Sequence, residues 1–137
     1  MQIVSNFEEL WRRNKSRMLH TGVCSHLIAV CQAYIKTDQF SKLVREWAAS
    51  ILSTDYSKWS YQLIFNLIQN DLTCQVEFGT NKFFSHFLEE GINQNSIVLV
   101  LKTLNLFLSN DKITNKVNVD YLKIAQNILN FYYNEGF

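Results

Sequence analysis

The sequence predicts an all-α protein, a right-handed superhelix of about seven helices within a single helical-repeat domain over residues 1–137. Three observations support this fold class. The chain has 137 residues with no proline and four glycines, whereas a β-sandwich or barrel of this length needs many Gly/Pro turns. Apolar residues recur every three or four positions along most of the chain, which is the helical period. Finally, two stretches resemble one another about forty residues apart, and a helical period of this size is typical of stacked repeats.

The internal repeat is visible in how the two stretches begin and end. The first begins at Thr37-Asp38-Gln39-Phe40 and the second at Thr80-Asn81-Lys82-Phe83. Each continues through apolar helices, and they close at Asn70-Asp71 and Asn110-Asp111. Repeats of this kind bury their apolar faces by stacking, so we expect this domain to be a stack that can also form one segment of a longer solenoid.

The first three helices are expected over about residues 6–18, 22–36 and from 39 to 52. Each carries an apolar stripe at helical spacing, for example Phe40, Leu43, Val44 and Trp47 in the third, with charged residues facing outward. Ser5 or Asn6 is the expected cap of the first helix.

The fourth helix, about residues 57–69, is apolar on nearly every side, which predicts a buried helix. A short helix over 72–78 follows, and Gly79 is expected to stop it as a left-handed residue. The next helix covers 81–90 and ends at Gly91.

Asn95 or Ser96 is expected to cap a second helix that is apolar all round and ends at Leu108, so burial on every side is predicted again. Residues 96–101 alone are compatible with a buried strand, but the apolar pattern continues to Leu108 and favours a helix. A polar loop over 111–118 precedes the last helix, about 119–133. Its expected apolar face consists of Tyr121, Ile124, Ala125, Ile128, Phe131 and Tyr132.

This order of short, amphipathic and buried helices occurs twice. In the second copy, residues 72–79, 83–88 and 101–106 resemble an armadillo repeat, in which a short helix ends at a glycine and a long third helix carries a Leu-Asn-Leu signature. The resemblance implies two armadillo/HEAT-like units with helical flanks. It also implies a scaffold or adaptor that recognises a peptide or helical segment of another protein.

In armadillo proteins, asparagines on successive third helices hold the backbone of an extended peptide, and Asn66 and Asn105 occupy the matching positions here. An Asn side chain offers the donor and the acceptor that a peptide group needs. Gln62 and Leu101 replace the tryptophans of the importin-type pattern, so binding of nuclear-localisation signals is not implied. The alternative role for both asparagines is local hydrogen bonding between neighbouring helices.

A basic helix near the N-terminus supports an alternative function. Its candidate binding residues are Trp11, Arg12, Arg13, Lys15 and Arg17. Arginines beside an aromatic ring can contact single-stranded nucleic acid or a phosphorylated or acidic tail. A solvated helix face explains the same pattern, and the overall balance of 13 basic and 12 acidic residues argues against bulk attachment to nucleic acid or membrane.

No enzymatic, metal or cofactor site is predicted. His20, Cys24 and Cys31 can share one helical face, but the tight Cys pairs of zinc sites are missing, and buried cysteines are ordinary small hydrophobes. Without a signal peptide or a membrane-spanning apolar run, we expect a cytoplasmic or nuclear protein that does not contact membranes. Its partner is expected to be another protein. Self-association through the aromatic C-terminal helix, which ends in Phe131 to Phe137, is a second expectation.

Overall fold

The computed structural model describes residues 49–69 and 71–135, and within these ranges all regular structure is helical, with no β-strand. The helices are α4 (Lys58–Ile68), α5 (Leu72–Gly79), α6 (Phe84–Glu90), α7 (Ile97–Leu108) and α8 (Tyr121–Glu135). This confirms the all-α prediction for the described part. The helices expected over 6–18 and 22–36, and most of the third, lie outside it. The right-handed superhelix and the two repeat units stay predictions.

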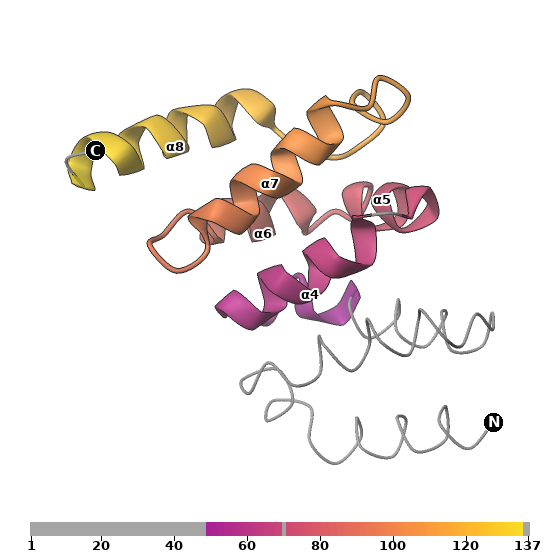
Figure 1. Ribbon diagram of the computed structural model, residues 1–137, viewed down its shortest axis with the longest axis horizontal. Helices are drawn as coiled ribbons and strands as arrows, with labels where there is room; N and C mark the ends of the chain where they lie inside the picture. Colours follow the sequence, from indigo (N-terminus) through magenta and orange to yellow (C-terminus); the bar gives the residue numbers. More distant parts are fainter. Residues whose placement is uncertain (1–48, 70, 136–137) are drawn as a thin grey trace, which may run out of the picture.

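Two long helices, α4 and α7, lie side by side and run in the same direction, and α6 passes behind α7 (Figure 1). The last helix, α8, extends away from α7 toward the C-terminal end of the molecule and packs mainly on α6. The described helices therefore form a layered stack in which α4 and α7 share one face.

Four phenylalanines form the centre of the core, where α5, α6 and α7 meet. Phe78, Phe84, Phe87 and Phe107 are all fully buried. The rings of Phe84 and Phe107 meet edge to face with centroids 5.4 Å apart, a favoured arrangement of aromatic pairs. Aliphatic residues of α4 complete the cluster: Leu63, Ile64, Leu67 and Ile68.

The structure confirms one buried helix and corrects the other. Every apolar side chain of α4 is buried or half-buried, as predicted. On α7 the helix bounds of 97–108 are confirmed and the strand alternative is wrong. However, burial all round is also wrong, because only the face with Ile97, Val100, Leu104 and Phe107 turns inward, while Val98 and Leu108 are exposed.

Asparagine side chains, rather than the expected residues, organise the starts of α6 and α7. Ser96 is the N-cap residue of α7, as predicted, but its side chain makes no cap bond. Asn93 Oδ1 instead accepts from the backbone N–H groups of Asn95 and Ser96 at 2.9 and 3.0 Å. Helix α6 begins at Phe84 rather than at 81, because Asn81 Oδ1 accepts from the N–H of Phe83 in a turn before the helix. At α5, Asp71 Oδ1 accepts from the N–H of Cys74 at 3.1 Å.

The two glycines of the described part, Gly79 and Gly91, are needed for close packing and not for a left-handed backbone. Gly79 is the last residue of α5, so the predicted left-handed stop is wrong. A methyl group at Gly79 would overlap the side chain of Val117, and one at Gly91 would lie 2.6 Å from Val100 Cγ2. Glycine therefore allows the loop after α7 and the side chains around Gly91 to approach the backbone.

The segment between α7 and α8 is not the polar loop that was expected. Ile113 and Val117 are buried in it and join the core. Its backbone is tied back to α5 by a bond from the N–H of Asn118 to the carbonyl oxygen of Gly79 at 2.6 Å. The loop thus closes one end of the core.

Helix α8 turns its predicted apolar face inward except at Ala125. Ile124 is fully buried and Ile128 is half-buried, as expected, but Ala125 is exposed. The opposite side carries three strongly exposed apolar residues, Leu122, Leu129 and Tyr133. The helix therefore has two apolar faces, only one of which is covered.

Leu67→Ala and Leu104→Ala each remove buried methyl groups from α4 and α7, where the side chains are 3% and 8% exposed. We expect each to lower the free energy of unfolding by about 2 to 5 kcal/mol. Leu108→Ala, at a side chain 53% exposed, is the control and should change it by less than about 0.5 kcal/mol. Chemical denaturation measures all three, and equal losses would place the core elsewhere.

Gly79→Ala should lower the free energy of unfolding by about 1 to 3 kcal/mol, because its methyl group overlaps Val117. Val117→Ala removes the obstructing methyl groups, so the double variant should lose less than the sum of the two single variants. A thermodynamic cycle by urea unfolding tests this. Strict additivity would mean that the two positions do not touch.

Candidate interaction surfaces

Helix α7 presents an apolar stripe to solvent. Val98, Leu101, Asn105 and Leu108 are all exposed and follow one another at intervals of three and four residues, so they lie along one side of the helix. The opposite side supplies the core. Helix α7 therefore carries large apolar residues on its exposed side as well as on its core side.

Helix α4 borders this stripe. Lys102 Nζ of α7 lies 6.0 Å from the ring centroid of Phe65 on α4, within the range of a cation–π contact. Phe65 and its neighbour Asn66 are both half-buried. Phe65 and Lys102 thus lie where α4 and α7 adjoin, and the surface formed by the exposed stripe of α7 with Phe65 and Asn66 of α4 is named here the α4–α7 face.

The two predicted groove residues lie on these neighbouring helices. Asn66 Oδ1 accepts from Gln62 Nε2 at 2.9 Å, which is a local bond within α4. Asn105 is exposed, and its Oδ1 has only a long contact of 3.5 Å from Ser109 Oγ. The local bonding that was the alternative role is therefore present at Asn66, whereas Asn105 presents its amide to solvent.

The predicted basic helix cannot be placed on any surface. Trp11, Arg12, Arg13, Lys15 and Arg17 lie outside the described residues, as do His20, Cys24 and Cys31. The third cysteine, Cys74, is fully buried in α5. No helix of the described ranges combines the length and the apolar character that a membrane span requires.

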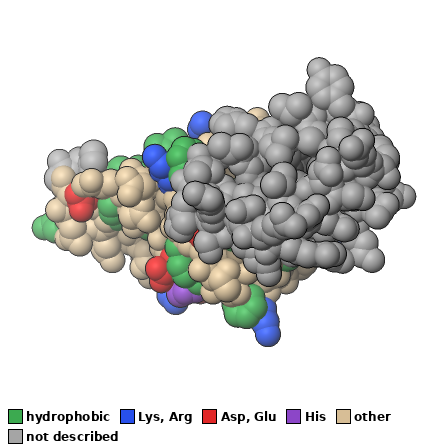
Figure 2. Space-filling model, turned by 90° about the horizontal axis from the view of Figure 1, so that it is seen from below, with side chains coloured by type: hydrophobic (Ala, Val, Ile, Leu, Met, Phe, Trp, Pro, Cys, Tyr) green, Lys and Arg blue, Asp and Glu red, His purple; other side chains and the backbone are tan. Residues whose placement is uncertain are grey.

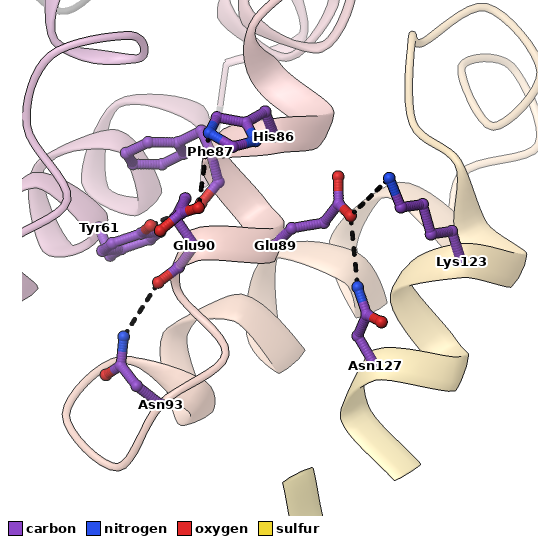
Figure 3. A network of polar contacts seen from close by, with 8 residues as sticks. All are labelled: Tyr61, His86, Phe87, Glu89, Glu90, Asn93, Lys123 and Asn127. Atoms are coloured by element: carbon purple, nitrogen blue, oxygen red, sulfur yellow. Dashed lines mark hydrogen bonds and ion pairs between the residues drawn. The ribbon is translucent and has the colours of Figure 1, made fainter. Parts of the chain in front are cut away.

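Polar contacts around α6 connect the neighbouring helices (Figure 3). Glu89 is a half-buried acceptor for two residues of α8, with Lys123 Nζ at 3.2 Å and Asn127 Nδ2 at 3.3 Å. On the other side of α6, the Tyr61 hydroxyl of α4 donates to the carbonyl oxygen of Phe87 at 2.5 Å. These contacts hold α6 to α4 and α8.

Tyr61 is the most perturbed titratable group of the described part. Its ring is buried and stacks on Phe87 with centroids 4.1 Å apart. Burial, reinforced by the negative charge of Glu90, raises the pKa of the Tyr61 phenol far above its ordinary value. Burial also raises the pKa of Tyr121. A phenol held this firmly in its neutral form serves as a hydrogen-bond donor and not as a proton-transfer group.

Sequence reasoning missed two surfaces: the exposed side of α7 and the outer side of α8. A signal for the second was available, because Leu122, Ala125 and Leu129 recur at intervals of three and four residues. For α7 no signal was available, since a helix apolar all round does not indicate which side faces the core.

Tyr61→Phe should lower the free energy of unfolding by about 1 kcal/mol at neutral pH, because the carbonyl of Phe87 loses its donor. It should also change how the free energy of unfolding depends on pH in the alkaline range. With a folded-state pKa raised above the unfolded value, wild-type stability is full below about pH 10. It then falls by up to about 1.4 kcal/mol per pH unit as the unfolded state releases the proton.

The variant lacks this contribution, so its stability should fall less steeply above pH 10. Denaturant titrations from neutral pH to pH 11 measure both effects, and Tyr133→Phe, at a ring 86% exposed, is the control. If the free energy of unfolding fell equally steeply above pH 10 in wild type and Tyr61→Phe, Tyr61 would not be buried in its neutral form.

Comparison of the chain with protein-family models, with curated proteins and with solved structures finds no match to it.

Proposed function

We propose that this chain is a non-enzymatic protein-interaction domain of scaffold or adaptor type, which binds an extended peptide segment of a partner protein along the α4–α7 face. The observation that carries the proposal is the exposed stripe of α7, in which Val98, Leu101 and Leu108 accompany Asn105. Apolar side chains for anchoring and an amide for backbone recognition occur on one surface, as peptide-binding faces require.

Amide side chains favour an extended segment over a helical one. A peptide in extended form has unpaired backbone N–H and C=O groups, and Asn or Gln can bond to both. Asn105 points its amide to solvent, and Asn66 and Gln62 form an amide pair on the adjoining helix. A helical segment, by contrast, has already satisfied its backbone and would use only the apolar stripe.

The charge of the α4–α7 face specifies the chemistry of the partner. The only charged residues on α4 and α7 are Lys58 and Lys102, and neither helix contains an acidic residue. Lys102 lies between the two helices beside Phe65. A segment that combines apolar side chains with a carboxylate near Lys102 complements this surface, whereas a basic segment would meet like charge.

The alternative of binding single-stranded nucleic acid or a phosphorylated or acidic tail through residues 11–17 rests on the sequence alone, because those residues lie outside the described part. Measuring binding at several salt concentrations distinguishes nucleic-acid binding by this alternative from binding at the α4–α7 face. Binding to nucleic acid weakens steeply as salt rises, while binding to an apolar stripe does not.

A displayed library of random peptides, each about 12 residues and so roughly 40 Å long when extended, tests the proposal. We expect selected peptides to be rich in apolar and acidic residues. Asn66→Ala combined with Asn105→Ala should weaken their binding by about tenfold, since one or two backbone hydrogen bonds are lost. Fluorescence anisotropy measures the dissociation constants.

Leu72→Ser is the matched control, because Leu72 of α5 is also an exposed apolar residue, at 51%, but lies on another element. Leu72→Ser should leave peptide binding unchanged. When the library is selected on Lys102→Glu instead, the enriched peptides should no longer be rich in acidic residues. If no peptide is enriched, or if the double variant and the control bind alike, the α4–α7 face is not the binding site.

A further inference from the structure

Helix α8 has an outer side that nothing in the described structure covers. Leu122, Leu129 and Tyr133 are 71%, 69% and 86% exposed, and Ala125 is exposed between them. In the view from below, the end of the molecule that α8 occupies shows isolated hydrophobic side chains on a mostly uncharged surface (Figure 2). This surface belongs to a different helix from the α4–α7 face and has no part in the proposed peptide site.

The outer side is also nearly free of charge. The only charged residues of α8 are Lys123 and Glu135. Lys123 pairs with Glu89 of α6, and Glu135 accepts from Gln94 Nε2 at 2.9 Å. Both charged side chains of α8 thus have partners on other parts of the domain. A partner that covered the stripe would therefore not desolvate an unpaired charge.

The spacing of the stripe is that of a two-helix seam. Leu122, Ala125, Leu129 and Tyr132 follow one another at intervals of three, four and three residues, which are the a and d positions of a heptad. Tyr132 is half-buried and packs edge to face on Phe131 with centroids 5.4 Å apart, so its ring is held at the margin of the stripe.

This seam is complementary to itself when two copies run antiparallel. With a two-fold axis at the level of Asn127, Leu129 of one copy faces Ala125 of the other, and Leu122 faces Tyr132. A large side chain thus meets a small one at the centre, which is how facing positions interdigitate. An interface between identical surfaces related by a two-fold axis is the commonest arrangement of homo-oligomers.

We propose that this protein forms a homodimer through the outer side of α8, in which two α8 helices pack antiparallel along Leu122, Ala125, Leu129 and Tyr132. Of the apolar face predicted from sequence only Ala125 and Tyr132 take part, since Ile124 and Ile128 already pack inward. A pair of 15-residue helices is about 22 Å long. Because so short a pair buries less than the roughly 1,600 Å² of a standard interface, we expect a weak and reversible dimer, for which about 10 to 100 µM is a suitable range of test concentrations.

Sedimentation velocity on the full chain, over concentrations from about tenfold below to tenfold above that range, tests the dimer. Leu129→Glu should raise the dissociation constant at least tenfold. Val98→Glu is the matched control, because Val98 is 59% exposed on α7, and it should leave the constant unchanged. Melting curves confirm that both variants fold, which is expected since neither side chain is in the core.

A second arm tests the antiparallel register. Ala125→Lys alone should also weaken the dimer, but mixing it with Leu129→Glu should restore association, because position 125 of one copy then faces position 129 of the other with opposite charge. A wild-type protein that stays monomeric, or that dimerises equally well with Leu129→Glu, overturns the proposal. Equal weakening by Val98→Glu also overturns it. A mixture that shows no recovery overturns the antiparallel arrangement.

Discussion

Tyr61 reaches from α4 to the C-terminal end of α6, where its ring stacks on Phe87 and its hydroxyl donates to the Phe87 carbonyl. Helix α6 has only seven residues, too few to persist alone in water. Its last carbonyl groups also need donors, because the N–H of Gly91 bonds to the carbonyl of Leu88 instead of that of Phe87. A single side chain therefore supplies both the apolar contact and the missing donor. The positions of the helices that pack on α6 follow from it.

The contact between Tyr61 and Phe87 requires the Tyr61 ring to lie close to the backbone of Gly91. A methyl group there would lie 2.5 Å from Tyr61 Cε1, so a larger residue would push the ring away from Phe87. Phe84 and Phe87 then face α7 and α4 from the same short helix, and Phe107 completes the cluster. On its other side, α6 offers Glu89 to α8. A helix of less than two turns thus connects three longer ones.

The sequence was sufficient for the fold class and for most helix bounds in the described part. Helix α4 was expected at 57–69 and is found at Lys58–Ile68, and α7 matches its expected 97–108. Apolar periodicity carries this information directly. Periodicity does not indicate which side of an apolar helix meets the core, because that depends on which other helices pack against it. For this reason the all-round burial of α7 was predicted wrongly, as was the inward place of Ala125 on α8. The role of Asn93 at the start of α7 was also missed, although Asn93 lies only two and three residues before the N–H groups from which it accepts.

For the candidate sites, sequence resemblance selected Asn66 and Asn105, and the structure places them on adjoining helices. The exposed Val98, Leu101 and Leu108 beside Asn105 were not foreseen, because they had been assigned to the interior. Likewise, Val117 and Ile113 lie in a segment whose other residues are polar, yet both are core residues, and Val117 packs directly against Gly79. Such pairings depend on the three-dimensional path of the chain and leave no local pattern.

The single fully buried side chain of α8, Ile124, sets this helix apart in its dynamics. Its remaining attachments to the domain are half-buried side chains and polar bonds, such as those of Lys123 and Asn127 to Glu89, and partly solvated bonds of this kind contribute little each. Regions with few buried contacts open by themselves, at a fraction of the free energy of global unfolding. The amide hydrogens of α8 should therefore exchange with solvent through detachment of this one helix. Those of α4 and α7 should be protected until the whole core separates.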